Sequence, residues 1–338
     1  MALTILSTIP FDEPSLAKIR AALPADAALH VQQVKSATEI QPELWQQVDI
    51  LYTGHVLPEP GSAPNLKWIQ SHFAGVDSYL DSGLFNDHTI ALTTLSGAAV
   101  PQIGEYVLTM LLAMGHKLPQ LMEHQKRADW PKDRHERFSP MELSGRTVGL
   151  IGYGSIGREI ARVLSAFGCT ILATKANAMQ PAEGDYTRPG RGDPDADHAT
   201  RIYPPQAMYS MLGLCDFAVV TVPLTNATRG LFNQRAFAAL KPGAYLVFVS
   251  RGEVYEEKDL LAALNDGNLA GVALDVFPQE PLPKNSPLWA HPNVIISPHI
   301  CGISPNYPED AAELFSENLK IYLSGGRLLN RFDPARGY

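Results

Sequence analysis

Three polar side chains that could carry acid–base chemistry each follow a largely apolar run in the second half of the chain. They are Arg251, Glu280 and His299, and the runs before them are Tyr245–Val249, Val272–Phe277 and Val294–Ile296. If these runs are strands of one parallel sheet, their carboxyl ends meet at the edge where ligands bind such sheets. The pattern therefore predicts that Arg251, Glu280 and His299 form one site.

Together these three side chains have the properties that reduction of a 2-keto acid requires. An arginine binds a carboxylate through two hydrogen bonds and polarises a ketone. A histidine donates a proton to the developing alkoxide, and a carboxylate beside it stabilises the charged ring. Taken singly, Arg251 could be a surface cation, Glu280 a loop acid and His299 a buried structural histidine. The combination favours a catalytic set.

A glycine-rich turn between an apolar strand and a helix predicts a dinucleotide site. Its sequence is Gly149-Leu150-Ile151-Gly152-Tyr153-Gly154-Ser155-Ile156-Gly157. Gly152 allows the turn, Gly154 lets the backbone approach a pyrophosphate, and Gly157 lets the helix pack closely on the strand. Helical spacing follows the motif, and a second apolar strand is expected at Cys169–Ala173. These neighbours favour a dinucleotide site over an ordinary glycine-rich turn.

The rest of the pattern indicates two α/β domains. With 338 residues, the chain exceeds what one hydrophobic core usually supports. The first hundred residues alternate between short apolar runs and helical segments, which is typical of a small domain with a parallel sheet. The strands expected there are Thr4–Thr8, Leu29–Val34, Asp49–Tyr52, Lys67–Ser71 and Ile90–Thr93, and the helices or turns are Ser15–Ala22 and Gln41–Gln47.

One long helix is expected after Pro101. Apolar residues recur at helical spacing as far as Leu121, and Trp130–Asp133 end the helix. Its apolar residues cover more than one face, so we expect it to lie at a domain or subunit boundary and to support a homodimer.

The glycine-motif domain continues through a long loop and further strands. Residues 176–205 show no periodicity and are rich in Pro, Gly, Asp and Arg, which predicts a loop. The strands expected after it are Ala218–Val222, Tyr245–Val249, Gly271–Leu274 and Val294–Ile296.

The composition argues against several classes of partner. A net charge of −8 does not favour nucleic acid, which needs clustered positive charge. No apolar run is long enough to span a bilayer, and the N-terminal residues lack the basic segment of a signal peptide. Cys169, Cys215 and Cys301 are too widely spaced for a disulfide framework or a zinc motif. We expect a cytoplasmic protein that binds no metal, membrane or nucleic acid.

Five motifs, in order along the chain, resemble those of the D-isomer-specific 2-hydroxyacid dehydrogenases. They are Gly149–Gly157, Val222–Gly230, Ser250–Gly252, Ala273–Leu282 and Asn293–His299. The resemblance extends over essentially the whole chain. It implies that Arg251 holds the substrate, that His299 is the general acid/base and that Glu280 is its partner.

The resemblance also implies a fold and further contacts. A Rossmann dinucleotide-binding domain, residues 99–296, would be inserted in a smaller flavodoxin-like α/β substrate domain of residues 1–98 and 297–338. Helix Asp310–Leu323 would return to that smaller domain. Asp275 would bond the nicotinamide amide. Backbone N–H groups of Ala74, Gly75 and Val76 would hold the substrate carboxylate. The cofactor contacts implied in the motifs are Gly152, Gly154, Ser155, Ile156, Gly157, Val222, Pro223 and Thr228.

One position departs from the pattern of NAD-preferring relatives, which carry an aspartate at the end of the strand after the glycine helix. Lys175 stands at that place. Lysine attracts the 2′-phosphate of NADP, whereas an acid repels it. We therefore favour NADP(H), with Thr174 as a hydrogen-bond donor and Arg188 and Arg191 as further cations. NAD(H) stays an alternative, since Lys175 could be a solvated surface cation.

Two functions stay open at this point. One is an NAD(P)H-linked reductase of a small 2-keto acid such as glyoxylate or hydroxypyruvate. The other is a dinucleotide-sensing binding protein of the corepressor kind on the same fold. Turnover of NAD(P)H with 2-keto acids distinguishes the two.

Overall fold

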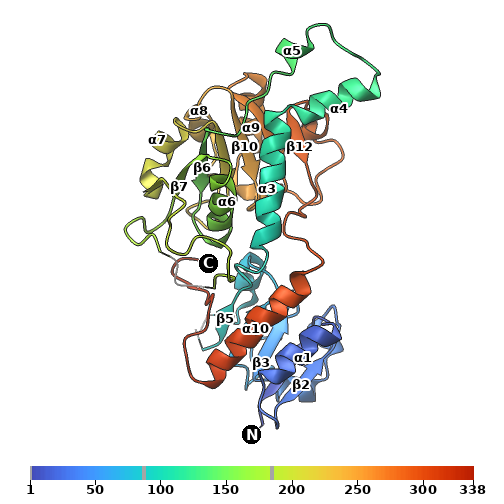
Figure 1. Ribbon diagram of the computed structural model, residues 1–338. Helices are drawn as coiled ribbons and strands as arrows, with labels where there is room; N and C mark the ends of the chain where they lie inside the picture. The colour runs from blue at the N-terminus through green and yellow to red at the C-terminus, as the bar shows by residue number, and fades with distance from the viewer. Residues whose placement is uncertain (1, 86–88, 183–185) are drawn as a thin grey trace. The chain divides into compact units, whose positions relative to one another are not determined.

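Figure 1 shows a computed structural model of the chain, which describes residues 2–85, 89–182 and 186–338. The backbone divides into two units, one of Met1–Ala99 with Ser304–Tyr338 and the other of Val100–Ile303. The family resemblance predicts domain limits at residues 98 and 296. The backbone groups residues 297–303, which include His299, with the glycine-motif unit.

The first unit is built on a parallel sheet of five strands in the order β2-β1-β3-β4-β5. Its strands are β1 (Thr4–Ser7), β2 (Ala28–Val31), β3 (Ile50–Thr53), β4 (Trp68–Ser71) and β5 (Ala91–Thr93). Its helices are α1 (Glu13–Ala21), α2 (Pro42–Trp45) and α10 (Tyr307–Leu323), with 3-10 turns η1 (Ala37–Glu39) and η2 (Asp77–Ser82). This strand order is that of flavodoxin-like folds, so the predicted class of this domain is confirmed.

Helices α1 and α10 lie side by side (Figure 1). The ring of Phe315 in α10 lies 4.8 Å from that of Tyr52 in β3 and 5.5 Å from that of Trp68 in β4. Both helices begin earlier than predicted because each has a proline in its first turn, where a missing N–H costs no hydrogen bond. Asp12 also caps α1 by accepting a hydrogen bond from Ser15 N at 2.9 Å.

The second unit is built on a parallel sheet of seven strands in the order β12-β11-β10-β9-β6-β7-β8. The strands are β6 (Thr147–Ile151), β7 (Thr170–Thr174), β8 (Arg201–Tyr203), β9 (Phe217–Val220), β10 (Ala244–Phe248), β11 (Leu269–Leu274) and β12 (Val294–Ile296). The first six of them, taken in chain order, have the Rossmann arrangement 3-2-1-4-5-6, which confirms the predicted fold.

Helices and 3-10 turns connect these strands. They are α3 (Val100–Gly115), α4 (Leu118–Lys126), α5 (Arg134–Arg137), α6 (Ser155–Ser165), η3 (Pro205–Ala207), α7 (Met208–Leu212), α8 (Gln234–Ala238), η4 (Gly252–Val254), α9 (Glu257–Asn265) and η5 (Pro287–Ala290). Every residue of β9 and β10 is buried, as expected for a parallel sheet covered on both faces. Helices α3 and α6 lie side by side (Figure 1). A Cβ on Gly104 of α3 would lie 3.2 Å from Glu159 Cγ, so glycine permits this close contact.

The single long helix predicted after Pro101 is wrong. The chain forms α3 and α4, and between them Lys117 has a φ of 54°. Pro119, near the start of α4, lacks an N–H, so the hydrogen bonds of α3 cannot continue through this point. Helix α4 ends at Lys126, before the predicted end.

The predicted loop of residues 176–205 contains a strand. Arg201–Tyr203 form β8 at the edge of the sheet and pair in parallel with Leu172–Thr174 of β7. This strand was missed because Arg201-Ile202-Tyr203 is not an apolar run, unlike the equally short β12. Within the same predicted loop, residues 183–185 lie outside the described residues.

Candidate active site and dinucleotide-binding turn

The glycine turn after β6 has the steric features that a dinucleotide cradle needs. Gly152 has a φ of 110°, and a Cβ there would lie 2.7 Å from Thr221 Oγ1. A Cβ on Gly157 would lie 2.2 Å from the carbonyl oxygen of Gly152. By contrast, no described atom lies within 4 Å of a Cβ built on Gly154. Packing within the protein requires Gly152 and Gly157, whereas Gly154 leaves open space beside the backbone.

The start of α6 continues this cradle. Gly154 is the residue before the helix, and no side chain forms a capping hydrogen bond there. The first N–H groups of a helix have no partner within it and attract anions. Ser155 and Ile156 supply such groups, so the turn fits the pyrophosphate of a dinucleotide.

Residues at the ends of the neighbouring strands support the turn. Thr174 at the end of β7 is buried, and its Oγ1 accepts a hydrogen bond from Gly152 N at 3.2 Å. Beyond β9, the backbone N of Val222 would lie 3.1 Å from a Cβ on Gly152. Thr228 Oγ1 donates to the carbonyl oxygen of Pro223 at 2.6 Å and thereby closes the loop after β9. The structure thus brings Thr174 and Val222 to the glycine turn.

Lys175 follows β7 at the predicted place, but its ammonium group holds the next segment. Its Nζ donates hydrogen bonds to the carbonyl oxygens of Pro181 and Ala182 at 3.1 and 3.0 Å. Lys175 therefore has a structural role in addition to any contact with a cofactor.

The segment after β7 packs on the first turn of α6 through groups that the sequence analysis missed. The buried side chain of Arg158 donates to the carbonyl oxygens of Pro181 and Asp193. Tyr153, within the glycine motif, donates its hydroxyl hydrogen to the Asp193 carboxylate. The sequence did carry one sign of this contact: Arg158 and Glu159 are charged residues at positions of α6 that are buried.

Glu159 of α6 is the second buried charge at this contact. It accepts hydrogen bonds from Arg162 and from Gly192 N, the latter at 2.6 Å, and lies 3.6 Å from Arg191. Burial opposes ionisation of Glu159, but these hydrogen bonds and cations outweigh it and lower its pKa below the ordinary value. Arg191, predicted as a further cation for the 2′-phosphate, thus lies beside the carboxylate of Glu159.

The predicted catalytic residues follow strands that end in register. Phe248, Leu274 and Ile296 are paired neighbours in β10, β11 and β12, so the loops after these strands leave the same edge. Arg251 follows β10, and one of its guanidinium nitrogens donates to Ser250 O at 2.9 Å. A Cβ on Gly252 would lie 1.8 Å from the carbonyl carbon of Phe277. The loop that carries Arg251 therefore lies directly against the segment that leads to Glu280.

His299 and Glu280 form a hydrogen-bonded pair. The distance from His299 Nδ1 to Glu280 Oε2 is 2.7 Å, and the side chains are 43% and 36% exposed. The other carboxylate oxygen of Glu280 accepts from Phe277 N at 2.9 Å. A carboxylate can only accept, so Nδ1 carries the hydrogen and Nε2 is left for a substrate.

Asp275 lies at the same sheet edge and is fully buried. Its Oδ1 accepts hydrogen bonds from Ser297 Oγ at 2.5 Å and Ile300 N at 2.9 Å. Its Oδ2 accepts from Cys301 N at 2.9 Å. The structure therefore uses this carboxylate to hold the backbone on both sides of His299.

The segment expected to hold the substrate carboxylate lies in the first unit, between β4 and η2. Among the described residues, the backbone N–H groups of Ala74, Gly75 and Val76 donate no hydrogen bond. Tyr307 of α10 fixes the start of this segment by donating to His72 O at 2.6 Å. Burial lowers the pKa of His72 to about 4, so its ring is neutral.

Comparisons with known proteins identify the family. Residues 108–301 match the model described as D-isomer specific 2-hydroxyacid dehydrogenase, NAD binding domain. The chain belongs to this family. The glyoxylate reductase of Thermofilum pendens is 32% identical over 265 residues, which are 78% of this chain and 74% of that protein.

Two further relatives cover most of this dehydrogenase. Glyoxylate/hydroxypyruvate reductase A of Yersinia enterocolitica is 28% identical over 82% of this chain and 83% of its own. The crystal structure of a D-isomer specific 2-hydroxyacid dehydrogenase from Xanthobacter autotrophicus Py2, in complex with NADPH and MES, is 27% identical with a TM-score of 0.79. It covers 100% of this chain and 99% of that one. The protein is therefore an NAD(P)-dependent oxidoreductase with a nicotinamide dinucleotide-binding domain.

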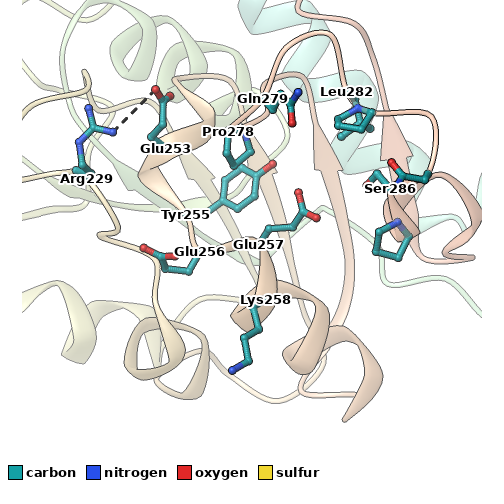
Figure 2. A pocket seen from close by; sticks show the side chains of 13 residues that line it. Arg229, Glu253, Tyr255, Glu256, Glu257, Lys258, Pro278, Gln279, Leu282 and Ser286 are labelled. Carbon is teal, nitrogen blue, oxygen red and sulfur yellow. Dashed lines mark ion pairs between the residues drawn. The ribbon is translucent and has the colours of Figure 1, made fainter.

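A cavity of about 670 Å³ lies in the second unit, lined in part by the residues just before Glu280 (Figure 2). Pro278 and Gln279, which precede Glu280, line it together with Tyr255, Glu257 and Leu282. Figure 2 also shows Arg229 and Glu253 at its rim, joined by an ion pair of 4.0 Å. None of the predicted catalytic or cofactor residues lines this cavity, so it is separate from the predicted catalytic set.

Two further findings concern metal ions and membranes. Within residues 2–85, 89–182 and 186–338, no cluster of His, Cys, Asp or Glu side chains is suited to a metal ion. Of the helices in these ranges, none has the length and apolar character that crossing a membrane requires.

Proposed function

We propose that this dehydrogenase reduces a small 2-keto acid of the glyoxylate or hydroxypyruvate type to the D-2-hydroxy acid. The observation that carries the proposal is the His299–Glu280 pair at 2.7 Å, which leaves His299 Nε2 for a substrate oxygen. The names of the relatives from Thermofilum pendens and Yersinia enterocolitica support the choice of substrate.

In the proposed reaction, His299 moves the proton. A reduced nicotinamide dinucleotide, held at the glycine turn, would supply the hydride that the carbonyl carbon of the keto acid accepts. His299 Nε2 donates a proton to the carbonyl oxygen as negative charge develops there. Glu280 accepts the Nδ1–H and so fixes the orientation of the ring, with Nε2 directed away from the carboxylate.

The other predicted residues bind and orient. Arg251 has the planar donor pair that matches a carboxylate and polarises the neighbouring ketone. In the first unit, the N–H groups of Ala74, Gly75 and Val76 are the proposed donors to a substrate carboxylate. Asp275 Oδ2 has one described hydrogen bond, so it retains acceptor capacity for the nicotinamide amide.

We also infer a preference for NADPH over NADH. Lys175 stands at the end of β7, where an acid would repel a 2′-phosphate. The related structure from Xanthobacter autotrophicus Py2 contains NADPH. The structure ties Lys175 to the segment after β7, so this segment is part of the proposed 2′-phosphate site.

A panel of 2-keto acids crossed with both cofactors tests these proposals. Loss of NADPH or NADH absorbance is followed with glyoxylate, hydroxypyruvate and a bulkier 2-keto acid. We expect turnover with the two small acids and a higher kcat/KM with NADPH. Binding of the dinucleotide without turnover of any acid would contradict the proposal and favour a dinucleotide-sensing binding protein.

We further propose a homodimer in the cytoplasm. Leu118, Leu121 and Met122 of α4 are 46%, 40% and 50% exposed, and Trp130 beyond the helix is 81% exposed. Such a group of apolar side chains marks a protein interface. The three cysteines are free, which fits a reducing compartment. Light scattering should give the mass of two chains, and M122K together with L121D should give that of one.

A further inference from the structure

Helix α3 holds both ends of the loop that carries His299, which comprises residues 297–302 and is called the His299 loop below. Tyr106 OH lies 2.6 Å from Ser297 Oγ at its start. Gln102 Nε2 donates to Gly302 O at 3.0 Å at its end. Residues four positions apart lie on one face of a helix, so Gln102 and Tyr106 contact the loop from a single face of α3.

Tyr106, Ser297 and Asp275 form a chain of hydrogen bonds in which each hydroxyl donates to the next group. Ser297 Oγ gives its only hydrogen to the Asp275 carboxylate at 2.5 Å, so Tyr106 must donate to Ser297. Burial raises the pKa of Tyr106 above its ordinary value, which keeps its hydroxyl protonated. The Asp275 carboxylate in turn accepts from the backbone N–H groups of Ile300 and Cys301, the two residues after His299.

The backbone of His299 needs such support. Its φ of 54° lies in the left-handed region, which non-glycine residues adopt at a cost. Hydrogen bonds to Ser297 on one side and to Ile300 and Cys301 on the other hold the chain in that conformation. The conformation sets the direction in which the ring leaves the backbone, and hence its 2.7 Å contact with Glu280.

We propose that Tyr106 is a positioning residue for the reaction, which acts through Ser297 and Asp275 to hold His299 against Glu280. Gln102 assists it at the other end of the loop. Neither residue needs to touch the substrate. The proposal rests on the proposed acid/base role of His299. It gives α3 a role in positioning that residue, which the apolar pattern of the helix alone does not indicate.

The test begins with Tyr106→Phe, which removes one hydroxyl. The matched control is Tyr245→Phe, because Tyr245 lies near the start of β10, at the end of that strand away from Arg251. We expect kcat to fall about 3- to 10-fold in Tyr106→Phe, the range for one hydrogen bond, with a smaller change in the KM for NADPH. The high-pH loss of kcat/KM should begin at a lower pH, because a displaced Glu280 stabilises the charged His299 less. Tyr245→Phe should match the wild type in all three measurements.

A double-mutant cycle then tests the route through Ser297. If Tyr106 acts only through that hydroxyl, Tyr106→Phe added to Ser297→Ala should cause no further fall in kcat. Multiplied effects would overturn the proposed route. Gln102→Ala offers a second, independent variant, for which we expect a smaller fall in kcat and the same direction of pH shift.

One more variant separates failure of this inference from failure of the proposed function. Near-normal turnover in His299→Ala would refute the acid/base assignment itself. If His299→Ala is inactive while Tyr106→Phe and Gln102→Ala keep wild-type kcat and pH profiles, the positioning role alone is wrong. Melting temperatures of all variants show whether a lost activity reflects unfolding. If Tyr106→Phe proves to be unfolded, the kcat and pH profile of Gln102→Ala decide whether α3 positions His299.

Discussion

The glycine turn after β6 and the His299 loop after β12 lie in the same unit but are held in their functional shapes by opposite means. The turn depends on the absence of side-chain atoms, since a Cβ on Gly157 would overlap the carbonyl oxygen of Gly152 at 2.2 Å. The His299 loop depends on added side chains, because Tyr106, Ser297 and Asp275 fix its backbone through hydrogen bonds.

The difference teaches how each region should respond to mutation. Adding one carbon atom damages the glycine turn, because close packing leaves no room for it. Removing one polar atom damages the His299 loop, because its backbone conformation depends on a connected network. The first kind of change should be visible mainly in stability and cofactor binding, and the second mainly in kcat and its pH dependence.

The largest effect is expected from His299→Ala. Loss of the proton donor should lower kcat about 100- to 10,000-fold, the usual contribution of general acid catalysis. Binding of NADPH, measured by fluorescence titration, should stay close to that of the wild type. A parallel loss of NADPH binding would mean that cofactor binding at the glycine turn depends on the His299 loop. The two regions would then not have the separate roles proposed here.

The second-largest effect is expected from Gly157→Ala. The added methyl group meets the backbone of Gly152, so α6 must move away from β6 at a cost of about 1–3 kcal/mol or more. We expect a lower midpoint in urea unfolding together with weaker NADPH binding. An unchanged midpoint would contradict the steric account of this turn.

Gly154→Ala is the matched comparison within the same turn. Since no described atom lies near the added Cβ, the urea midpoint should stay at the wild-type value. The methyl group would occupy the space beside the backbone, so the Kd for NADPH should rise about tenfold, or about 1.4 kcal/mol. Stability loss without a change in Kd would show that this space faces the protein and not the dinucleotide.

The smallest effect is expected from Lys175→Ala. The NADPH/NADH ratio of kcat/KM should fall about 3- to 10-fold, in keeping with the loss of one partly exposed charge contact. Lys175→Arg, which keeps the positive charge, is the control. If the ratio is the same in all three proteins, the turn recognises only the shared parts of the two cofactors, and the NADPH preference is wrong.

The sequence predicted those parts of the molecule that depend on local pattern. Apolar periodicity and the glycine motif were enough to locate β6, α6 and the strands before Arg251 and His299, and the family resemblance predicted the Rossmann fold. The break at Lys117 was missed because a single left-handed residue leaves almost no pattern. Strand β8 was missed because Arg201-Ile202-Tyr203 is not an apolar run, whereas the equally short edge strand β12 is one.

The support of the His299 loop could not be read from the chain for a different reason. Tyr106 and Ser297 are 191 residues apart, and in the sequence Tyr106 is one more large residue within an apolar helix. Only the three-dimensional packing of α3 shows that its hydroxyl has a polar partner. In the same way, Tyr153 and Arg158 stand within or beside a recognised motif, yet their partners come from the segment after β7.

That last contact limits how the gene could be shortened. Arg158 is 1% exposed and lies in the helix that follows the glycine motif, while carbonyl oxygens from residues 181 and 193 accept its hydrogen bonds. Deleting the segment between β7 and β8 would leave a guanidinium group in the interior with fewer acceptors, which is costly for a buried charge. A trimmed version of this enzyme should therefore require a second change, to a small apolar residue at position 158, before it can be produced in folded form.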